Sequence, residues 1–485
     1  MLAILRRIAG LILALFGIPA LGWWTAGELA GFRRPVRLLG IELGDASVAP
    51  YLANAALGTA ALGATLVLLI VLAALFCGRN RDRLVLFFGL VVEIVSLALA
   101  VLVVLQAAIA AYSLVIIELV FLNRFYWQTV PAIGLGAIVV AFEIARSGYR
   151  LKAPLETAVL GIAVSAAEQP RLWQLVRSIA DRLKARPPNH IILGLSPDFF
   201  AIAAPVRLAG YDAVLTGETL YLSLPLLRSL SGEELTAIIG HELGHFLGED
   251  TAYTIRFVPI YRGLVQALGA ASIDAGFLAA KPAQAVLELC LLLFGRAERA
   301  IGRERELAAD RLGAAIASPE AVVAALLHTA FAPQVWAAVV GKAIQGIQSG
   351  APVDNLSTLY AEQAAAAMAA VTPVERLAAL RDRHQPHPTD THPTADARAA
   401  ALGIALDVSL LDFAAGADLA ITLVDSAEAL ELSLSATCHT LLIESGKARP
   451  PRNGNRPTAS QKKRAVLANR AAARQRALDK TAGPI

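Results

Sequence analysis

Two histidines and a glutamate stand close together near the middle of the chain, in the segment His241-Glu242-Leu243-Gly244-His245. On a helix, residues i and i+4 share one face, so both imidazoles can bind the same metal ion. Glu242 lies between them and is placed to act as a general base on a water molecule. A catalytic zinc ion is expected to have three protein ligands, so a further His, Asp or Glu must come from elsewhere in the chain.

The residues before this motif predict the start of the helix that carries it. Ser231 can cap the helix, Glu234 completes a capping box, and Leu230 can pack against Leu235. The alternative is that the motif is a chance match or a buried histidine pair. A capped helix with apolar neighbours weakens that alternative.

A second group of charged residues occupies positions 303–310, with the sequence RERELAAD. This pattern is typical of a helix on which Glu306 and Asp310 share a face, while the small Ala308 and Ala309 allow a neighbouring helix to approach closely. A carboxylate four residues from a ligand is suited to accept the second ring N–H of a metal-bound histidine. The alternative is a solvated helix whose Arg and Glu side chains pair with one another.

Together with a later His392-Pro-x-x-x-x-Arg398 segment, these motifs resemble the HtpX and CAAX-prenyl-protease family of membrane-embedded zinc metallopeptidases. The resemblance covers about residues 151–402. It implies one zinc ion per chain, bound by His241, His245 and Glu306.

The resemblance also implies the catalytic residues. Glu242 corresponds to the general base, and Asp310 to the aspartate that supports a zinc-bound histidine. His392 is the candidate for a catalytic histidine and is preferred to His387, because Arg398 follows it at the family's distance. A late-domain histidine could donate to the oxyanion, and the residue that does so is left open. The competing interpretation of this segment is a flexible loop of histidines and prolines, or a weak adventitious metal site. Gly302 stands where the family often has a serine.

The composition indicates a membrane protein. The 485 residues are 56 % hydrophobic and 17 % charged, with a mean hydropathy of +0.58, which excludes a disordered or purely soluble chain. Four apolar runs, 8–24, 55–76, 84–122 and 130–145, predict four or five transmembrane helices within residues 1–150, and the third run is long enough for a helical hairpin.

Residues 151–411 are expected to form a mainly α-helical, zincin-like peptidase domain of the α+β type with a small β-sheet. Gly217-Glu218 suits a tight hairpin between strands at 213–216 and 219–224. The alternating pattern of Thr219–Leu224 predicts a half-buried strand at a sheet edge, to which a substrate strand could add.

Three further regions complete the predicted organisation. The apolar stretch 257–295 is interrupted by charges, which favours an amphipathic hairpin resting on the membrane over a full span. Residues 412–446 carry no readable motif. Residues 447–485 hold eleven Lys or Arg against Asp479 alone, which predicts a mobile basic arm that binds anionic lipids, with RNA as the second choice.

The resulting functional hypothesis is a multi-pass protein of the cytoplasmic membrane that acts as a zinc endopeptidase on misfolded or membrane-associated polypeptides. Basic residues at Arg146, Arg150 and Lys152 favour a catalytic domain facing the cytoplasm. The alternatives are a site-specific processing peptidase of the CAAX type and a membrane scaffold with a degenerate zinc domain. No specific nucleic-acid partner is expected, and three widely spaced cysteines suggest no disulfide framework.

Overall fold

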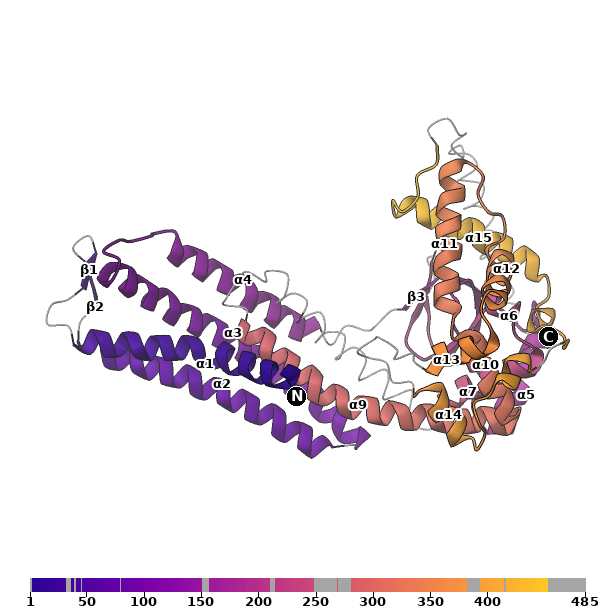
Figure 1. Ribbon diagram of the computed structural model, residues 1–485, viewed down its shortest axis with the longest axis horizontal. Helices are drawn as coiled ribbons and strands as arrows, with labels where there is room; N and C mark the ends of the chain where they lie inside the picture. Colours follow the sequence, from indigo (N-terminus) through magenta and orange to yellow (C-terminus); the bar gives the residue numbers. More distant parts are fainter. Residues whose placement is uncertain are drawn as a thin grey trace, which may run out of the picture.

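A computed structural model describes residues 2–31, 36–38, 41–44, 46–78, 80–150, 157–209, 214–247, 268, 281–381, 393–413 and 416–451. The chain is mostly helical and has two parts, an elongated helical bundle and a mixed α+β part with small sheets (Figure 1). The fold class predicted from the sequence is therefore confirmed.

The first 150 residues form the bundle, in which consecutive helices run in opposite directions. Its members are α1 (Leu2–Ala30), α2 (Ala49–Cys77), α3 (Arg81–Val120) and α4 (Thr129–Arg150), with the short β1 (Val36–Leu38) and β2 (Ile41–Gly44) between α1 and α2. The run that could have been a helical hairpin is a single 40-residue helix, α3. Among the described residues of this region there are therefore four helices.

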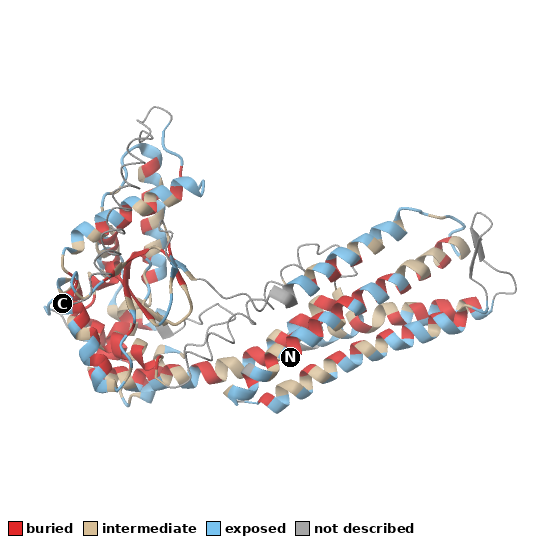
Figure 2. Ribbon diagram, turned by 180° about the vertical axis from the view of Figure 1, so that it is seen from behind, coloured by how far each residue is buried: buried red, intermediate tan, exposed pale blue. Residues whose placement is uncertain are grey.

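Five segments of the described residues are long and apolar enough to cross a membrane, and four of them are these helices. Large apolar side chains such as Leu75, Leu86 and Leu97 are exposed on the outside of the bundle (Figure 2). A lipid environment accounts for this exposure, because soluble proteins rarely leave so much contiguous apolar surface in water.

Aromatic residues mark one end of the bundle. Trp23 and Trp24 near the end of α1, Tyr51 at the start of α2 and Trp127 before α4 are exposed, and Trp24 stacks on Phe121 with ring centroids 5.7 Å apart. Tryptophan and tyrosine concentrate at membrane–water interfaces. The other boundary then lies at the end where α2 ends and α3 begins.

The strands and short helices between residues 157 and 244 precede and position the histidine motif. They are β3 (Thr157–Val159), β4 (Gly161–Val164), α5 (Pro170–Leu183), β5 (His190–Gly194), β6 (Phe200–Ile202), β7 (Val206–Leu208), β8 (Val214–Leu215), β9 (Thr219–Ser223), α6 (Leu224–Leu227) and α7 (Gly232–Gly244).

The larger sheet has the order β4-β5-β9-β6, with β9 parallel to β5 and antiparallel to β6. The prediction of a half-buried edge strand at 219–224 is wrong, because β9 is central and all five of its residues are buried. The predicted hairpin around Gly217 is also wrong, since β8 pairs with β7 instead. Within the described residues, β6 is the edge strand on that side of the sheet.

The remaining helices follow α7 along the chain. They are α9 (Lys281–Ile316), α10 (Pro319–Thr329), α11 (Ala332–Ser349), α12 (Leu356–Ala369), α13 (Pro373–Arg381), α14 (Ala395–Ala401), the 3-10 turns η2 (Val408–Asp412) and η3 (Ala420–Leu423), and α15 (Ala427–Glu444). The fifth apolar segment, Pro319–Ser349, comprises α10 and α11. Residues of α11 and α15 contribute to the same hydrophobic core as α7.

Helix α9 belongs to both parts of the molecule (Figure 1). Its N-terminal half packs on the bundle, where Phe294 lies against Phe88 of α3 with ring centroids 4.7 Å apart. Its C-terminal half packs on α7. Where the stretch 257–295 is described, from Lys281 onward, it is thus a helix buried against the bundle. The predicted hairpin from 257, like most of the predicted basic arm, otherwise lies outside the described residues.

Candidate metal centre

Helix α7 begins as its sequence predicts. The Ser231 hydroxyl accepts a hydrogen bond from the Glu234 backbone N–H at 3.2 Å, and the Glu234 carboxylate accepts one from the Ser231 N–H at 2.8 Å. This capping box satisfies N–H groups that a helix start otherwise leaves without partners. Ten residues after the cap, His241 and His245 lie on one face at the helix end.

Small residues allow α7 and α9 to approach closely. A Cβ atom on Gly313 of α9 would stand 2.7 Å from the Ala237 carbonyl oxygen of α7, and one on Gly240 would stand 3.1 Å from the Gly313 Cα. A Cβ on Gly244 would meet the Ala309 Cα at 3.5 Å. Ala309 thus takes part in the contact as predicted, whereas Ala308 is exposed.

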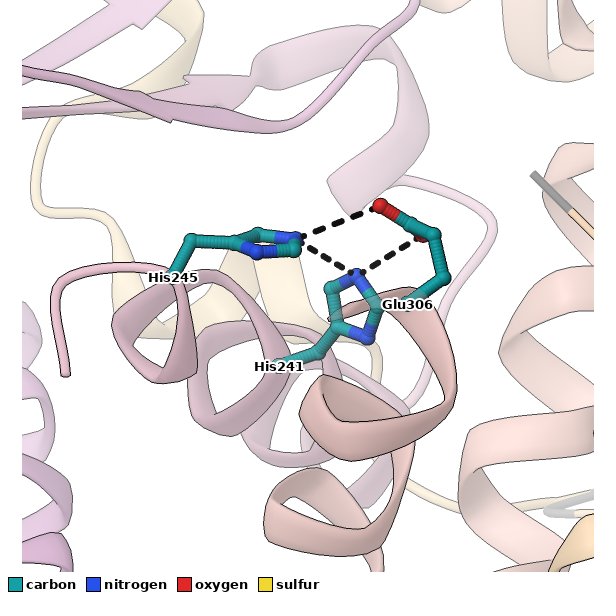
Figure 3. A group of neighbouring side chains, drawn as sticks. All are labelled: His241, His245 and Glu306. Atoms are coloured by element: carbon teal, nitrogen blue, oxygen red, sulfur yellow. Dashed lines mark hydrogen bonds and ion pairs between the residues drawn. The ribbon is translucent and has the colours of Figure 1, made fainter. Parts of the chain in front are cut away.

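The close approach brings together three side chains that could bind a metal ion (Figure 3). The Nε2 atoms of His241 and His245 are 3.2 Å apart, and each lies 3.5 Å from a carboxylate oxygen of Glu306. Ligand atoms about 2.0–2.1 Å from one tetrahedral zinc ion are about 3.3–3.4 Å from one another. The donor set therefore fits zinc in both chemistry and spacing.

Asp310 and Arg398 lie on the side of the His241 ring opposite the candidate site. The Nδ1 atom of His241 lies 3.0 Å from Asp310 Oδ1, and Arg398 donates from Nε to Asp310 Oδ2 at 2.7 Å and from a terminal nitrogen to Oδ1. Asp310 is fully buried, and burial alone would raise its pKa. Hydrogen bonds from Arg398 and His241 outweigh that effect and lower the pKa. Asp310 thus remains an ionised acceptor that turns Nε2 of His241 toward the candidate site.

Glu242 lies beside the group and contacts the edge strand of the sheet. Its Oε2 accepts a hydrogen bond from the backbone N–H of Ala201 in β6 at 2.9 Å. Burial raises the pKa of Glu242 to about 7, and the nearby charges of Glu306 and Asp198 act in the same direction. A carboxylate with a pKa near neutrality is suited to accept and return a proton.

The other predicted or considered histidines do not join this group. His392 lies outside the described residues. His328 bridges the Glu234 carboxylate and the Leu411 carbonyl, and His190 contacts the Thr216 carbonyl. Both therefore have structural contacts outside the candidate metal centre.

Sequence reasoning missed the role of Arg398. The sequence gives only its spacing after His392, whereas the structure places its guanidinium on Asp310, 88 residues away along the chain. Its position on a short helix, with Thr394 as the cap, gave no indication of this buried partner.

A His-Glu-x-x-His helix completed by a glutamate from a second helix, in an α+β domain joined to apolar helices, defines the class of membrane-attached metallopeptidases. Comparison with known families agrees with this class, because residues 167–404 match peptidase family M48. This part of the chain belongs to that family.

Individual relatives of the chain are named protease HtpX homolog. The chain is 35 % identical over 99 residues to the protease HtpX homolog of Archaeoglobus fulgidus, covering 20 % of this chain and 27 % of the relative. It is 30 % identical over 168 residues to protease HtpX homolog 1 of Saccharolobus solfataricus, covering 34 % and 46 %. With the protease HtpX homolog of Pyrobaculum calidifontis it shares 30 % identity over 177 residues, covering 35 % and 49 %. The chain thus spans about half or less of these relatives' length, and no solved structure matches it.

Proposed function

We propose that this protein is a membrane-anchored zinc endopeptidase. The observation that carries the proposal is the convergence of His241, His245 and Glu306 within coordination distance of one point, with the partly buried carboxylate of Glu242 beside them. Two imidazoles and one carboxylate are a common donor set for a catalytic zinc with an open position.

The protein residues have separate tasks in this proposal. When bound, zinc supplies a Lewis acid that polarises the scissile carbonyl and makes water acidic enough to attack near neutral pH. Glu242 takes the proton of the attacking water and returns it to the leaving amine. Asp310, held by Arg398, keeps the ring of His241 in one orientation.

The substrate strand is proposed to lie along β6. In an antiparallel strand, the N–H and the C=O of one residue point to the same side of the strand. The Ala201 N–H points to Glu242 rather than to β9. The Ala201 carbonyl is then on the open edge of the sheet, where an extended peptide can donate to it next to Glu242. Pairing through backbone groups makes little demand on sequence, which suits misfolded chains.

The peptidase domain is proposed to face the cytoplasm. If α1 to α4 each cross the membrane once, the N-terminus, the α2–α3 turn and the residues after α4 lie on one side of the membrane. That side carries Arg6, Arg7, Arg79, Arg81, Arg83, Arg146, Arg150 and Lys152, whereas the opposite loops carry Arg33, Arg34, Arg37 and Arg124. Basic residues accumulate in cytoplasmic loops. Substrates are then misfolded or membrane-associated proteins reached from that side.

Metal removal and replacement test this proposal. Purified full-length protein loaded with zinc is expected to cleave casein, an unfolded model substrate. A chelator should abolish cleavage, and added zinc should restore it while added magnesium does not, because magnesium prefers oxygen ligands. Cleavage that persists after metal analysis shows the zinc to be gone would contradict the proposal.

A further inference from the structure

A cavity of about 420 Å³ lies between the end of α2 and the middle of α9, outside the metal centre. Small residues create it: Ala74 on α2, Gly78 directly after α2, and Ala297 and Ala300 on α9. The remaining walls are apolar or basic, and they are Val71, Leu75, Leu293, Arg296 and Arg303.

The two arginines form the polar side of the cavity. Arg296 and Arg303 are seven residues apart, so they share one face of α9, two turns from each other. Both are exposed, and within the described part of the chain no carboxylate lies within ion-pair distance of either guanidinium. The cavity therefore combines an apolar wall with two positive charges that are available to an anion.

The cavity lies at the end of a candidate membrane span. The candidate span α2 ends at Cys77, and α3 begins at Arg81, so Gly78 is in the turn between two membrane-crossing helices. Figure 1 shows α9 leaving the bundle at this end. Along α9, Leu293 lies toward the bundle and Arg303 toward the peptidase domain. The apolar wall thus faces the hydrocarbon region, and the arginines reach the level of the headgroups.

We propose that this cavity binds an anionic phospholipid. The lipid phosphate lies between Arg296 and Arg303, and the first part of an acyl chain lies along Val71, Leu75 and Leu293. Guanidinium groups bind phosphate oxygens through paired N–H donors. A lipid with net negative charge is preferred to a zwitterionic one, because the positive choline of phosphatidylcholine would be repelled by the second arginine.

The bound lipid would connect the bundle to the metal centre. Arg303 precedes Glu306 by three residues, about one helical turn, on the same continuous helix. A lipid held between α2 and α9 stabilises the position of α9, and with it the carboxylate offered to the metal. The site itself does not depend on the proposed peptidase activity.

Lipid binding by the intact protein tests the proposal. Full-length protein in detergent is titrated with phosphatidylglycerol or phosphatidylcholine, and bound lipid is counted by native mass spectrometry together with the thermal unfolding temperature. We expect at least ten-fold tighter binding of phosphatidylglycerol. The double variant Arg296→Gln/Arg303→Gln should reduce that preference at least ten-fold.

Matched variants separate this site from general charge effects. Arg311→Gln/Lys342→Gln removes the same charge from exposed positions of the peptidase part and should bind phosphatidylglycerol like wild type. Ala300→Leu keeps both arginines and narrows the cavity, so it should also weaken binding. Equal binding of the two lipids, or an unaltered preference in the Arg296/Arg303 variant, would overturn the proposal. Displacement of phosphatidylglycerol by millimolar inorganic phosphate would show that free phosphate, rather than lipid, is the occupant.

Discussion

The orientation of His241 depends on a chain of buried contacts that ends at Arg398. One carboxylate oxygen of Asp310 contacts the His241 ring, and both oxygens contact the Arg398 guanidinium. The Asp310 side chain has no exposure to solvent. Loss of one partner from such a pair leaves an uncompensated buried charge, which costs more than loss of a surface ion pair. The histidine, the aspartate and the arginine therefore act as a unit.

Arg398→Leu tests this unit. We expect the free energy of unfolding to fall by about 3–5 kcal/mol, because Asp310 keeps its charge without the arginine. Zinc affinity should fall by about 10–100-fold, as is typical when the partner of a metal-bound histidine is disturbed. Thermal unfolding and zinc titration measure the two effects. Arg311→Leu, at an exposed position of α9, is the control, and equal zinc affinity in both variants would refute a role for Arg398 in positioning His241.

Glu306→Ala tests the third ligand. Zinc content should fall from about one ion per chain to about none, because two histidines alone hold zinc weakly. Glu304→Ala removes an exposed carboxylate from the same helix and should keep its zinc. The zinc content of each purified variant is measured by metal analysis. Undiminished zinc in Glu306→Ala would exclude Glu306 from the ligand set.

The local motifs of the candidate metal centre could be predicted from the sequence, whereas contacts between residues far apart in the chain could not. The spacing of His241, Glu242 and His245 and the capping box before them follow from helix geometry. The pairing of Arg398 with Asp310 depends on how α14 docks on α9, which no local pattern encodes. The predicted catalytic residue His392 lies outside the described residues, so its role stays a prediction.

The contact between α7 and α9 sets the separation of the ligands. Gly240 and Gly244 on α7 face Gly313 and Ala309 on α9, and side chains at these positions would push the helices apart. Displacement of α9 by a fraction of its diameter would carry Glu306 out of reach of both histidines. Small residues at this contact therefore serve the metal centre, although none of them touches it.

Gly313→Ala tests this contact by adding a single methyl group. The added methyl would stand 2.7 Å from the Ala237 carbonyl, so the backbone of one helix must shift. We expect a loss of about 1–3 kcal/mol in unfolding free energy and weaker zinc binding. The matched change Gly341→Ala, where no atom lies within 4 Å of the new methyl, should stabilise the protein by about 0.5–1 kcal/mol. Unchanged zinc affinity in Gly313→Ala would show that the spacing of the two helices is not critical.

Two strand predictions failed for a physical reason. Thr219 and Tyr221 look like residues of a half-exposed edge strand, yet both are fully buried. Thr219 Oγ1 has no hydrogen-bond partner among the described residues, whereas the Tyr221 hydroxyl accepts a hydrogen bond from the Ser196 N–H at 2.8 Å. A polar side chain that finds a buried partner no longer marks the solvent face. The order of strands in the sheet depends on such partners, and alternation within one strand does not reveal them.

The whole molecule is organised around α9, which runs from the bundle into the peptidase domain. Apolar length alone predicted the membrane helices, but α3 showed that a long run need not contain a hairpin. If α1 to α4 each cross the membrane once, a single α3 makes the number of crossings within residues 1–150 even. This agrees with the proposal that both ends of this region lie on the same side of the membrane.

Cysteine labelling tests the orientation. The native Cys77, Cys290 and Cys438 are buried, so an introduced exposed cysteine can be followed by itself. In intact cells, Gln128→Cys in the loop before α4 should react with a membrane-impermeant reagent, whereas Lys342→Cys in α11 should react only after the cells are opened. Labelling of Lys342→Cys in intact cells would place the peptidase domain outside.

The central claim is that Glu242 moves the proton in a zinc-dependent peptide hydrolysis, and Glu242→Gln measures it most directly. The variant keeps the shape of the side chain and is not expected to disturb the three zinc ligands. Zinc content and unfolding temperature should therefore match wild type, while the rate of casein cleavage falls by about 10²–10⁴-fold. Glu233→Gln, at an exposed position of the same helix, should cleave at the wild-type rate. A zinc-loaded Glu242→Gln protein that digests casein as fast as wild type would contradict the proposed mechanism.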